Sequence, residues 1–158
     1  MAIKFSYITW SSVEKSCAKL GDMIKKDFEP DVLVGISRGG LVPVRLLSDK
    51  LGNSNIGIMR VVFYKGAGKT IGFPKIVQPL NIDVKGKKVL VVDDIVDTGM
   101  SMQVAIDHIK RRGAKEIRVA VIDYKQSSSI KPHYYANKAS KWIVYPWMKE
   151  ETKRERIK

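Results

Sequence analysis

Apolar residues recur at helical spacing in three stretches of the chain. The first stretch follows Ser11, where apolar residues stand three or four positions apart up to Phe28, as on one face of an amphipathic helix. Ser11 and Glu14 have the form of a capping box, and Pro30 is expected to end this helix. The other two predicted helices each end at a glycine C-cap and span 41–51, before Gly52, and 100–112, before Gly113.

Continuous apolar runs rich in β-branched residues lie between these helices, and such runs are typical of buried strands. The predicted strands are 32–36, 56–64, 89–92, 117–122 and a last one between Lys141 and Tyr145. Alternation of strands and helices indicates an α/β fold, with a mostly parallel sheet flanked by helices. At 158 residues the chain is expected to form a single domain, 1–158.

The segment 65–83 breaks this alternation. It contains glycines, lysines and two prolines without a regular period, and we interpret it as a long loop with at most a short extended piece. Loops of that length are usually functional lids or disordered segments. Within it GAGKT, residues 66–70, is similar to the end of a P-loop. However, Phe63 stands where that motif needs its first glycine, and Pro74 argues against the helix that must follow.

Composition narrows the class of protein. Hydrophobic residues make up 44%, and no apolar run approaches the roughly 20 residues that span a bilayer. The start, MAIKFSYITWSS, has no signal-peptide h-region. The single cysteine, Cys17, cannot form an internal disulfide and stands at helical spacing from Val13 and Leu20, which favours core packing. Together these points predict a cytoplasmic protein without a membrane segment.

Positive charge is in large excess. The chain has 29 Lys and Arg against 16 Asp and Glu, a net charge of +13. Such an excess attracts polyanionic substrates and also nucleic acid, so charge alone does not choose between them. The basic residues are dispersed, and the largest loop cluster without acidic neighbours is Lys65, Lys69 and Lys75. The tail 149–158 alternates in sign and is expected to be a solvated end.

Candidate chemistry lies where the predicted strands end. In parallel sheets, ligands bind beyond the carboxyl ends of the strands. Three unusual loops leave those ends: SRGG at 37–40, DDIVDTGMS at 93–101 and YKQSSS at 124–129. The fold is therefore expected to bring these loops to one edge of the sheet.

The DTGMS turn has the features of a phosphate cradle. Near Met100 the following helix presents unpaired backbone N–H groups, and Gly99 permits a tight turn. Thr98 and Ser101 add hydroxyl groups, and the set suits a phosphate monoester. Considered alone, the turn is equally typical of an N-cap followed by a turn glycine.

An acidic pair precedes this turn. Asp93 and Asp94 can accept hydrogen bonds from vicinal sugar hydroxyls and can hold a divalent cation. A phosphate cradle beside two diol acceptors describes a ribose 5-phosphate site. In the SRGG loop, Arg38 and Ser37 can hold a second anion, although alone this loop would be a plain βα turn. The pair is also similar to the acidic pocket of receiver domains, where it follows the first strand rather than the third.

These motifs resemble a known family. VLVVDDIVDTGMS at 89–101 is similar to the signature of type I phosphoribosyltransferases, which bind 5-phosphoribosyl-1-pyrophosphate (PRPP). VGISRGGLVP at 34–43 and KWIVYPW at 141–147 resemble the 6-oxopurine branch, especially bacterial xanthine–guanine phosphoribosyltransferase and its archaeal purine relatives. The resemblance covers nearly the whole chain. It implies the type I fold with a small hood, a mobile active-site loop at 65–83 and a base-binding region at 125–148.

The resemblance implies the residues that bind PRPP. Asp93 and Asp94 would bind the ribose hydroxyls and help place Mg²⁺, the implied cofactor. The 5-phosphate would be wrapped by Asp97, Thr98, Gly99, Met100 and Ser101. The pyrophosphate loop, where the family often has a non-proline cis peptide, would be formed by Ser37, Arg38 and Gly39. From the loop at 65–83, Lys69 or Lys75 would reach the pyrophosphate.

The resemblance also implies the base site. Lys125 would donate to the purine 6-oxo group, Trp142 would stack on the base, and the backbone of Ile143 would meet its edge. An ammonium at this position favours an oxo group over the amino group of adenine, since an amino group would leave a donor facing a donor. Asp97 would lie near N7 as the candidate general acid or base. The sequence leaves the choice among guanine, hypoxanthine and xanthine open, because QSSS replaces the family's usual proline-containing turn after Lys125.

The implied function is purine salvage. A nucleobase nitrogen attacks C1 of PRPP, and pyrophosphate leaves. The expected partners are PRPP, a purine base and further copies of the chain in a homodimer or homotetramer. The alternative is a regulator with the same fold that senses PRPP and binds RNA or DNA. It is suggested by the net charge of +13, but no additional DNA-binding domain fits in 158 residues, so nucleic acid is not an expected partner.

Overall fold

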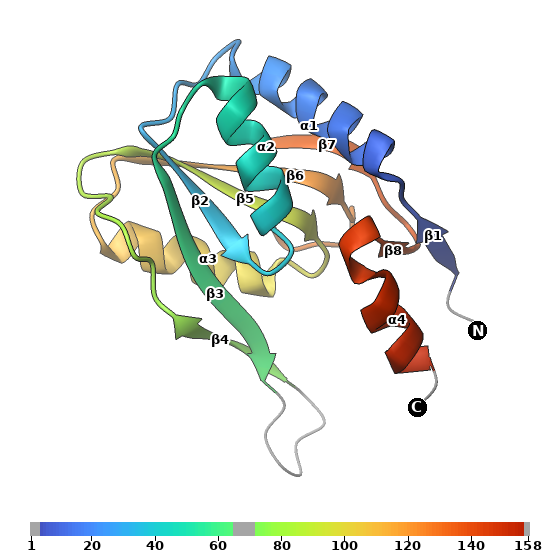
Figure 1. Cartoon of the computed structure of the whole chain (residues 1–158). Helices are drawn as coiled ribbons and strands as arrows, with labels where there is room; N and C mark the ends of the chain where they lie inside the picture. Colours follow the sequence, from blue (N-terminus) through green and yellow to red (C-terminus); the bar gives the residue numbers. More distant parts are fainter. Residues whose placement is uncertain (1–3, 65–71, 157–158) are drawn as a thin grey trace.

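The structure, a computed structural model, describes residues 4–64 and 72–156. Within these residues the main sheet has six strands in the order β4-β3-β2-β5-β6-β7, and β4 alone runs antiparallel to its neighbour (Figure 1). The strands are β2 (Val32–Ser37), β3 (Ile56–Tyr64), β4 (Phe73–Gln78), β5 (Lys88–Val96), β6 (Glu116–Tyr124) and β7 (Tyr134–Lys138). A smaller parallel sheet pairs β1 (Phe5–Tyr7) with β8 (Trp142–Val144).

Helices cover both faces of the main sheet (Figure 1). On one face lie α1 (Trp10–Ile24) and α2 (Leu41–Leu51), and on the other lies α3 (Met100–Arg111). Because strand side chains alternate between faces, each face buries its own apolar cluster. Leu33 and Leu90 pack on the side of α1 and α2, whereas Val34 and Val91 pack on the side of α3.

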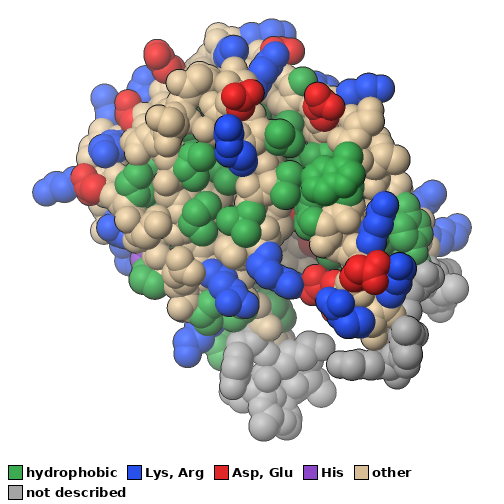
Figure 2. All heavy atoms as spheres, in the orientation of Figure 1, with side chains coloured by type: hydrophobic (Ala, Val, Ile, Leu, Met, Phe, Trp, Pro, Cys, Tyr) green, Lys and Arg blue, Asp and Glu red, His purple; other side chains and the backbone are tan. Residues whose placement is uncertain are grey.

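The chain after β8 turns away from the sheet. It forms the short 3₁₀ helix η1 (Pro146–Met148) and then α4 (Lys149–Arg156), which extends outward toward the C-terminus (Figure 1). On the face in Figure 2, Lys and Arg side chains are scattered, with Asp and Glu among them. No helix among residues 4–64 and 72–156 is long and apolar enough to cross a bilayer.

The predicted fold class is confirmed, and several elements have the predicted bounds. α2 and β3 begin and end where the sequence pattern placed them. The two predicted C-cap glycines have left-handed backbones, with φ of 66° at Gly52 and 82° at Gly113. β5 extends beyond the predicted 89–92, so Asp93 and Asp94 lie within a strand.

The prediction for the first helix is wrong at both ends. Its N-cap is Thr9 rather than Ser11, because the Thr9 hydroxyl accepts from the backbone N–H of Ser12 at 3.1 Å. The helix ends at Ile24, before Phe28. The N–H of Phe28 still donates to the carbonyl of Ile24 at 2.9 Å, and the Phe28 side chain is buried. The helical spacing of apolar residues therefore continues through a turn that is no longer helix.

The sequence pattern missed β1 and β7, and the predicted last strand, β8, joins the small sheet. Both missed strands are short, and β1 has only half-buried or exposed side chains. Within the segment 65–83, the short extended piece is β4, which forms a hairpin with β3. The helix that a P-loop would need after Thr70 is thus replaced by a strand. Residues 65–71 lie outside the described part of the chain.

Parallel pairing aligns the strand ends that matter for the site. Gly35 of β2 is paired with Val92 of β5, and Asp93 is paired with Val121 of β6. The loops that follow β2, β5 and β6 therefore leave the sheet at one edge, as predicted.

Candidate active site

The acidic pair lies at the centre of this edge. Asp94 is 7% exposed, and its backbone N–H donates to Asp93 Oδ1 at 2.9 Å. Burial raises the pKa of both carboxyl groups above the ordinary carboxyl range, and the Asp94 carboxylate raises that of Asp93 further. Two poorly solvated carboxylates side by side favour a ligand that brings hydrogen-bond donors or positive charge.

The SRGG loop lies directly against this pair. A Cβ atom on Gly39 would stand 2.4 Å from Asp94 Oδ2, and one on Gly40 would stand 2.4 Å from the carbonyl oxygen of Val92. Neither position has room for a side chain, which explains why the loop carries two glycines. The peptide bond between Ser37 and Arg38 is cis, as the resemblance implied.

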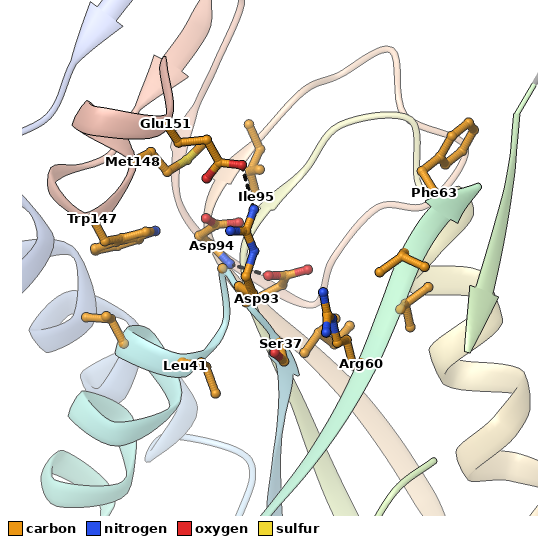
Figure 3. A pocket seen from close by; sticks show the side chains of 16 residues that line it. Ser37, Leu41, Arg60, Phe63, Asp93, Asp94, Ile95, Trp147, Met148 and Glu151 are labelled. Carbon is orange, nitrogen blue, oxygen red and sulfur yellow. Dashed lines mark hydrogen bonds and ion pairs between the residues drawn. The ribbon is translucent and has the colours of Figure 1, made fainter. Parts of the chain in front are cut away.

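A cavity of about 650 Å³ opens between this loop, β3, the acidic pair and the C-terminal segment (Figure 3). Two arginines, Arg38 and Arg60, line it together with Asp93, Asp94 and Glu151. Sequence reasoning missed Arg60 and Glu151. Arg60 left one signal, as the only charged residue of β3, whereas Glu151 left none within an alternating tail.

Glu151 reaches the SRGG loop from α4. Its Oε1 lies 2.6 Å from Arg38 Nη2, and the Arg38 side chain is 68% exposed (Figure 3). Residues 149, 150 and 153–155 are exposed, as expected of a solvated end, but Glu151 and Thr152 are not. Residues 149–156 form a helix, and one of its carboxylates is paired with a predicted site residue.

The predicted phosphate cradle is a turn at the N-terminus of α3. Gly99 has a φ of 89°, which a residue with a side chain rarely adopts, and a Cβ there would stand 2.7 Å from the hydroxyls of Ser128 and Ser129. Ser129 donates its N–H to the carbonyl of Thr98 at 3.0 Å. The cradle residues 97–101 and the loop after β6 are thus packed together.

The residues predicted for the base lie beside the cradle. Lys125 Nζ is 2.8 Å from Asp97 Oδ2 and 5.8 Å from the centre of the Trp142 ring. The Lys125 side chain is 20% exposed, whereas that of Asp97 is 47% exposed and the Trp142 residue 42% exposed. Ile143 follows in β8, paired with Ser6 of β1. An ammonium, a carboxylate and an open indole face therefore lie together.

The predicted loop contacts with pyrophosphate have no counterpart in the described residues. Lys75 lies in β4, opposite Val62, and does not line the cavity. Lys69 is outside the described residues. The contact remains a prediction.

The Tyr145 hydroxyl donates a hydrogen bond to the backbone of Asp94, a contact that the sequence did not indicate. This hydroxyl lies 2.6 Å from Asp123 Oδ2 and 3.0 Å from the carbonyl oxygen of Asp94. Burial and the nearby carboxylates raise the pKa of Tyr145, so the hydroxyl stays protonated. Trp147 stacks on the Tyr145 ring at 4.8 Å and contacts Trp10 at 5.7 Å.

Comparison with known proteins agrees with this geometry. The profile of the phosphoribosyl transferase domain matches residues 9–151. The chain belongs to the phosphoribosyltransferase family. The predictions of this family and of a transferase enzyme are confirmed, and the alternative of a PRPP-sensing regulator is not favoured.

Relatives within the phosphoribosyltransferase family cover most of the chain. Xanthine-guanine phosphoribosyltransferase of Gluconobacter oxydans is 25% identical over 92% of this chain and 85% of its own. Hypoxanthine-guanine phosphoribosyltransferase of Streptococcus pneumoniae is 29% identical over 76% of this chain and 68% of its own. The crystal structure of purine phosphoribosyltransferase from Pyrococcus horikoshii superposes with a TM-score of 0.83 at 39% identity and covers 90% of this chain and 93% of its own.

The acidic pair fits the Mg²⁺ on which phosphoribosyltransferases generally depend. No group of three or more His, Cys, Asp or Glu side chains within residues 4–64 and 72–156 forms a complete metal site. Mg²⁺ often binds in proteins through one or two carboxylates, with substrate phosphate oxygens and water as its other ligands. Asp93 and Asp94 are the carboxylates that could hold such an ion.

Proposed function

We propose that this protein transfers the 5-phosphoribosyl group of PRPP to a 6-oxopurine base and releases pyrophosphate, in purine salvage. The observation that carries the proposal is the position of Lys125, beside Asp97 and the Trp142 ring at the cradle end of the site. The names of the relatives, which act on xanthine, hypoxanthine and guanine, support the same substrate class.

The ribose phosphate would bind between the cradle and the acidic pair. Backbone N–H groups at the start of α3 and the hydroxyls of Thr98 and Ser101 would hold the 5-phosphate. Asp93 and Asp94 would accept hydrogen bonds from the ribose hydroxyls. Mg²⁺, held by these carboxylates and the substrate, would supply positive charge next to the pyrophosphate.

The pyrophosphate would lie in the 650 Å³ cavity, between the two arginines that line it. Arg38 lines it from the SRGG loop. Arg60 lines it from β3 (Figure 3). Guanidinium groups bind phosphate oxygens with paired hydrogen bonds and stay charged at all working pH values. They would stabilise the negative charge that the pyrophosphate gains as it leaves C1.

The base would stack on the exposed face of Trp142, with its 6-oxo group toward Lys125. The ammonium donates to an oxo group, but it would face the N–H donors of a 6-amino group in adenine. Asp97, 2.8 Å from this ammonium, would lie near N7 and act as acid or base there, or position the ring. The ion pair with Asp97 would hold the Lys125 ammonium beside the base.

The test incubates the protein with PRPP, Mg²⁺ and one base at a time, and assays nucleotide and pyrophosphate. Hypoxanthine and adenine form a matched pair, since they differ in the 6-substituent. We expect product from at least one of hypoxanthine, guanine and xanthine, and little from adenine. Product from adenine alone would refute the assignment.

Substitution of Lys125 tests the basis of this selectivity. Lys125→Gln should lower kcat/KM for hypoxanthine by about 10- to 100-fold, the value of a hydrogen bond from a charged donor. The ratio of kcat/KM for hypoxanthine to that for adenine should fall as well. The control is Lys131→Gln, which neutralises an exposed lysine outside the site. Equal losses in both variants would contradict the assigned role of Lys125.

The role of Asp97 is tested separately. Asp97→Ala should depress turnover much more than it weakens PRPP binding, because it removes an acid or base at the purine and leaves the cradle amides in place. Equal losses of turnover and binding would favour a positioning role alone. We also expect the protein to be cytoplasmic and to form a homodimer or homotetramer. Analytical ultracentrifugation tests the oligomeric state.

A further inference from the structure

Within the described part of the chain, α4 makes few contacts with the other helices and strands. Its sequence, KEETKRER, contains no hydrophobic residue, and Thr152 is its one buried residue among those whose burial is described. It packs mainly against the short η1 that precedes it. An eight-residue helix of this composition is marginal on its own.

The contact that ties α4 to the site is the ion pair between Glu151 and Arg38. The two side chains are 2.6 Å apart, at the wall of the cavity that also holds Arg60 (Figure 3). The other ion pair that α4 makes in the described part of the chain, between Lys153 and Glu150 at 2.7 Å, lies within the helix itself.

This pairing affects what an incoming anion meets. The charged side chains that line the cavity are Arg38, Arg60, Asp93, Asp94 and Glu151, so three carboxylates oppose two guanidinium groups. While Glu151 is paired with Arg38, it occupies a donor that a phosphate would use and adds a negative charge beside it. A pyrophosphate group can use Arg38 fully only if Glu151 withdraws.

We propose that Glu151 is a latch on the pyrophosphate end of the site. In the ligand-free protein it holds α4 against Arg38, and PRPP or pyrophosphate releases α4 by taking the guanidinium. Glu151 is thus a residue that regulates access to Arg38, and α4 is a helix whose docking reports occupancy. The inference rests on the proposed function, which puts pyrophosphate in this cavity.

Removal of the Glu151 carboxylate is expected to increase the affinity for PRPP by a small factor. The Arg38 side chain is 68% exposed, and ion pairs with such exposure are weak because water and salt screen them. Loss of the competing carboxylate should therefore tighten binding of PRPP by about two- to fivefold. A residue that merely orients Arg38 would give the opposite result, since its removal would weaken binding.

Three variants separate the latch from a simple charge effect. Glu151→Gln removes the charge and the ion pair. Glu151→Asp keeps the charge but withdraws the carboxylate from Arg38 by one methylene. Glu150→Gln removes a charge from the neighbouring residue, which is paired with Lys153 rather than with Arg38.

The experiment measures Kd for PRPP with Mg²⁺ and for pyrophosphate with Mg²⁺ by calorimetry. We expect tighter binding by both Glu151 variants and an unchanged Kd in Glu150→Gln. Hydrogen exchange of the amides at 149–156 provides a second readout. In the wild type, PRPP should speed exchange in α4, whereas in Glu151→Gln exchange should already be fast and respond little.

Several results would overturn the latch. The first is PRPP binding by Glu151→Gln that is weaker than, or equal to, that of the wild type. The second is slower hydrogen exchange in α4 when PRPP binds. The third is tighter PRPP binding by Glu150→Gln together with an unchanged Kd in Glu151→Asp. The last result would assign the effect to net charge. Wild-type protein that forms nucleotide from a 6-oxopurine but gives one of these results refutes the latch alone. Wild-type protein that neither binds PRPP nor forms product refutes the proposed function as well.

Discussion

Gly39→Ala tests whether the SRGG loop and the acidic pair act as one unit. The added Cβ would stand 2.4 Å from Asp94 Oδ2 and 2.5 Å from its Cγ. Ordinary contacts of such atoms begin near about 3.4 Å, so the loop and the carboxylate must separate by about 1 Å. Asp94 is 7% exposed and has little free space into which to move.

The size of the effect follows from that displacement. Overpacking of a buried site costs about 1–3 kcal/mol of stability, which lowers the melting temperature of a chain of this size by about 2–12 °C. A misplacement of about 1 Å in a reacting site lowers the rate by about 100-fold. We therefore expect Gly39→Ala to remain folded at 25 °C while its kcat/KM for PRPP falls by about two orders of magnitude.

Two further glycines provide controls at the ends of α2. At Gly52 nothing lies within 4 Å of an added Cβ, and its φ of 66° makes alanine strained without touching the site. Gly52→Ala should lose about 1–2 kcal/mol of stability and keep its activity. At Gly40 the added atom would meet the backbone oxygen of Val92 at 2.4 Å, which cannot turn aside, so Gly40→Ala should be the least stable.

The assay combines thermal unfolding with steady-state kinetics at varied PRPP and saturating base. If Gly39→Ala keeps wild-type kcat/KM, or if its activity falls only as far as that of an equally destabilised Gly52→Ala, the coupling of the loop to Asp94 is refuted.

Three other predictions follow from local contacts. Thr9→Ala should lower the free energy of unfolding by about 1 kcal/mol, as loss of an N-cap does, whereas Ser11→Ala should lower it little. Urea titration measures both losses, and a larger loss at Ser11 would contradict the observed cap. Cys17 is 2% exposed, and burial raises its pKa to about 12. An aromatic disulfide reagent at pH 8 should therefore label it only after the protein unfolds. Rapid labelling of the native protein would contradict the buried position of Cys17. Burial also raises the pKa of Asp123, although hydrogen bonds from Tyr145 and Asn137 oppose the shift. The folded state then binds this proton more tightly than the unfolded state, so the stability it contributes is present below the ordinary carboxyl pKa and is lost as pH rises through the raised value. The stability of Asp123→Asn relative to the wild type should therefore increase as the pH rises from 4 to 7, and urea midpoints at each pH measure it. A stability difference that stays constant with pH would refute the raised pKa of Asp123.

Much of the fold could be predicted because its signals are local. α2 and β3 were found with their bounds because each carries a full period of its own pattern and is bounded by turn residues such as Gly52. The three site loops could be assigned to one edge because parallel strands joined by helices leave no other arrangement. The groupings of Asp93 with Asp94, and of the 97–101 turn with a helix N-terminus, follow from adjacency in the sequence.

What the sequence could not supply depends on residues that are far apart along the chain. The missed strands, β1 and β7, have three and five residues, too few to display a clear period, and β1 exists because it pairs with the predicted strand β8. Thr9 and Ser11 are both good cap residues, and only the backbone conformation selected Thr9.

The sequence by itself therefore determined the α/β class and predicted which residues would bind the phosphate and the ribose, because hydrophobic periodicity and a contiguous motif are local properties. The tertiary structure decided which charges meet. Arg60 enters the cavity from a neighbouring strand, Tyr145 reaches Asp123 across the core, and Glu151 folds back onto Arg38. Each of these contacts depends on the distance between two side chains in space, and that distance is fixed by packing rather than by their separation along the chain.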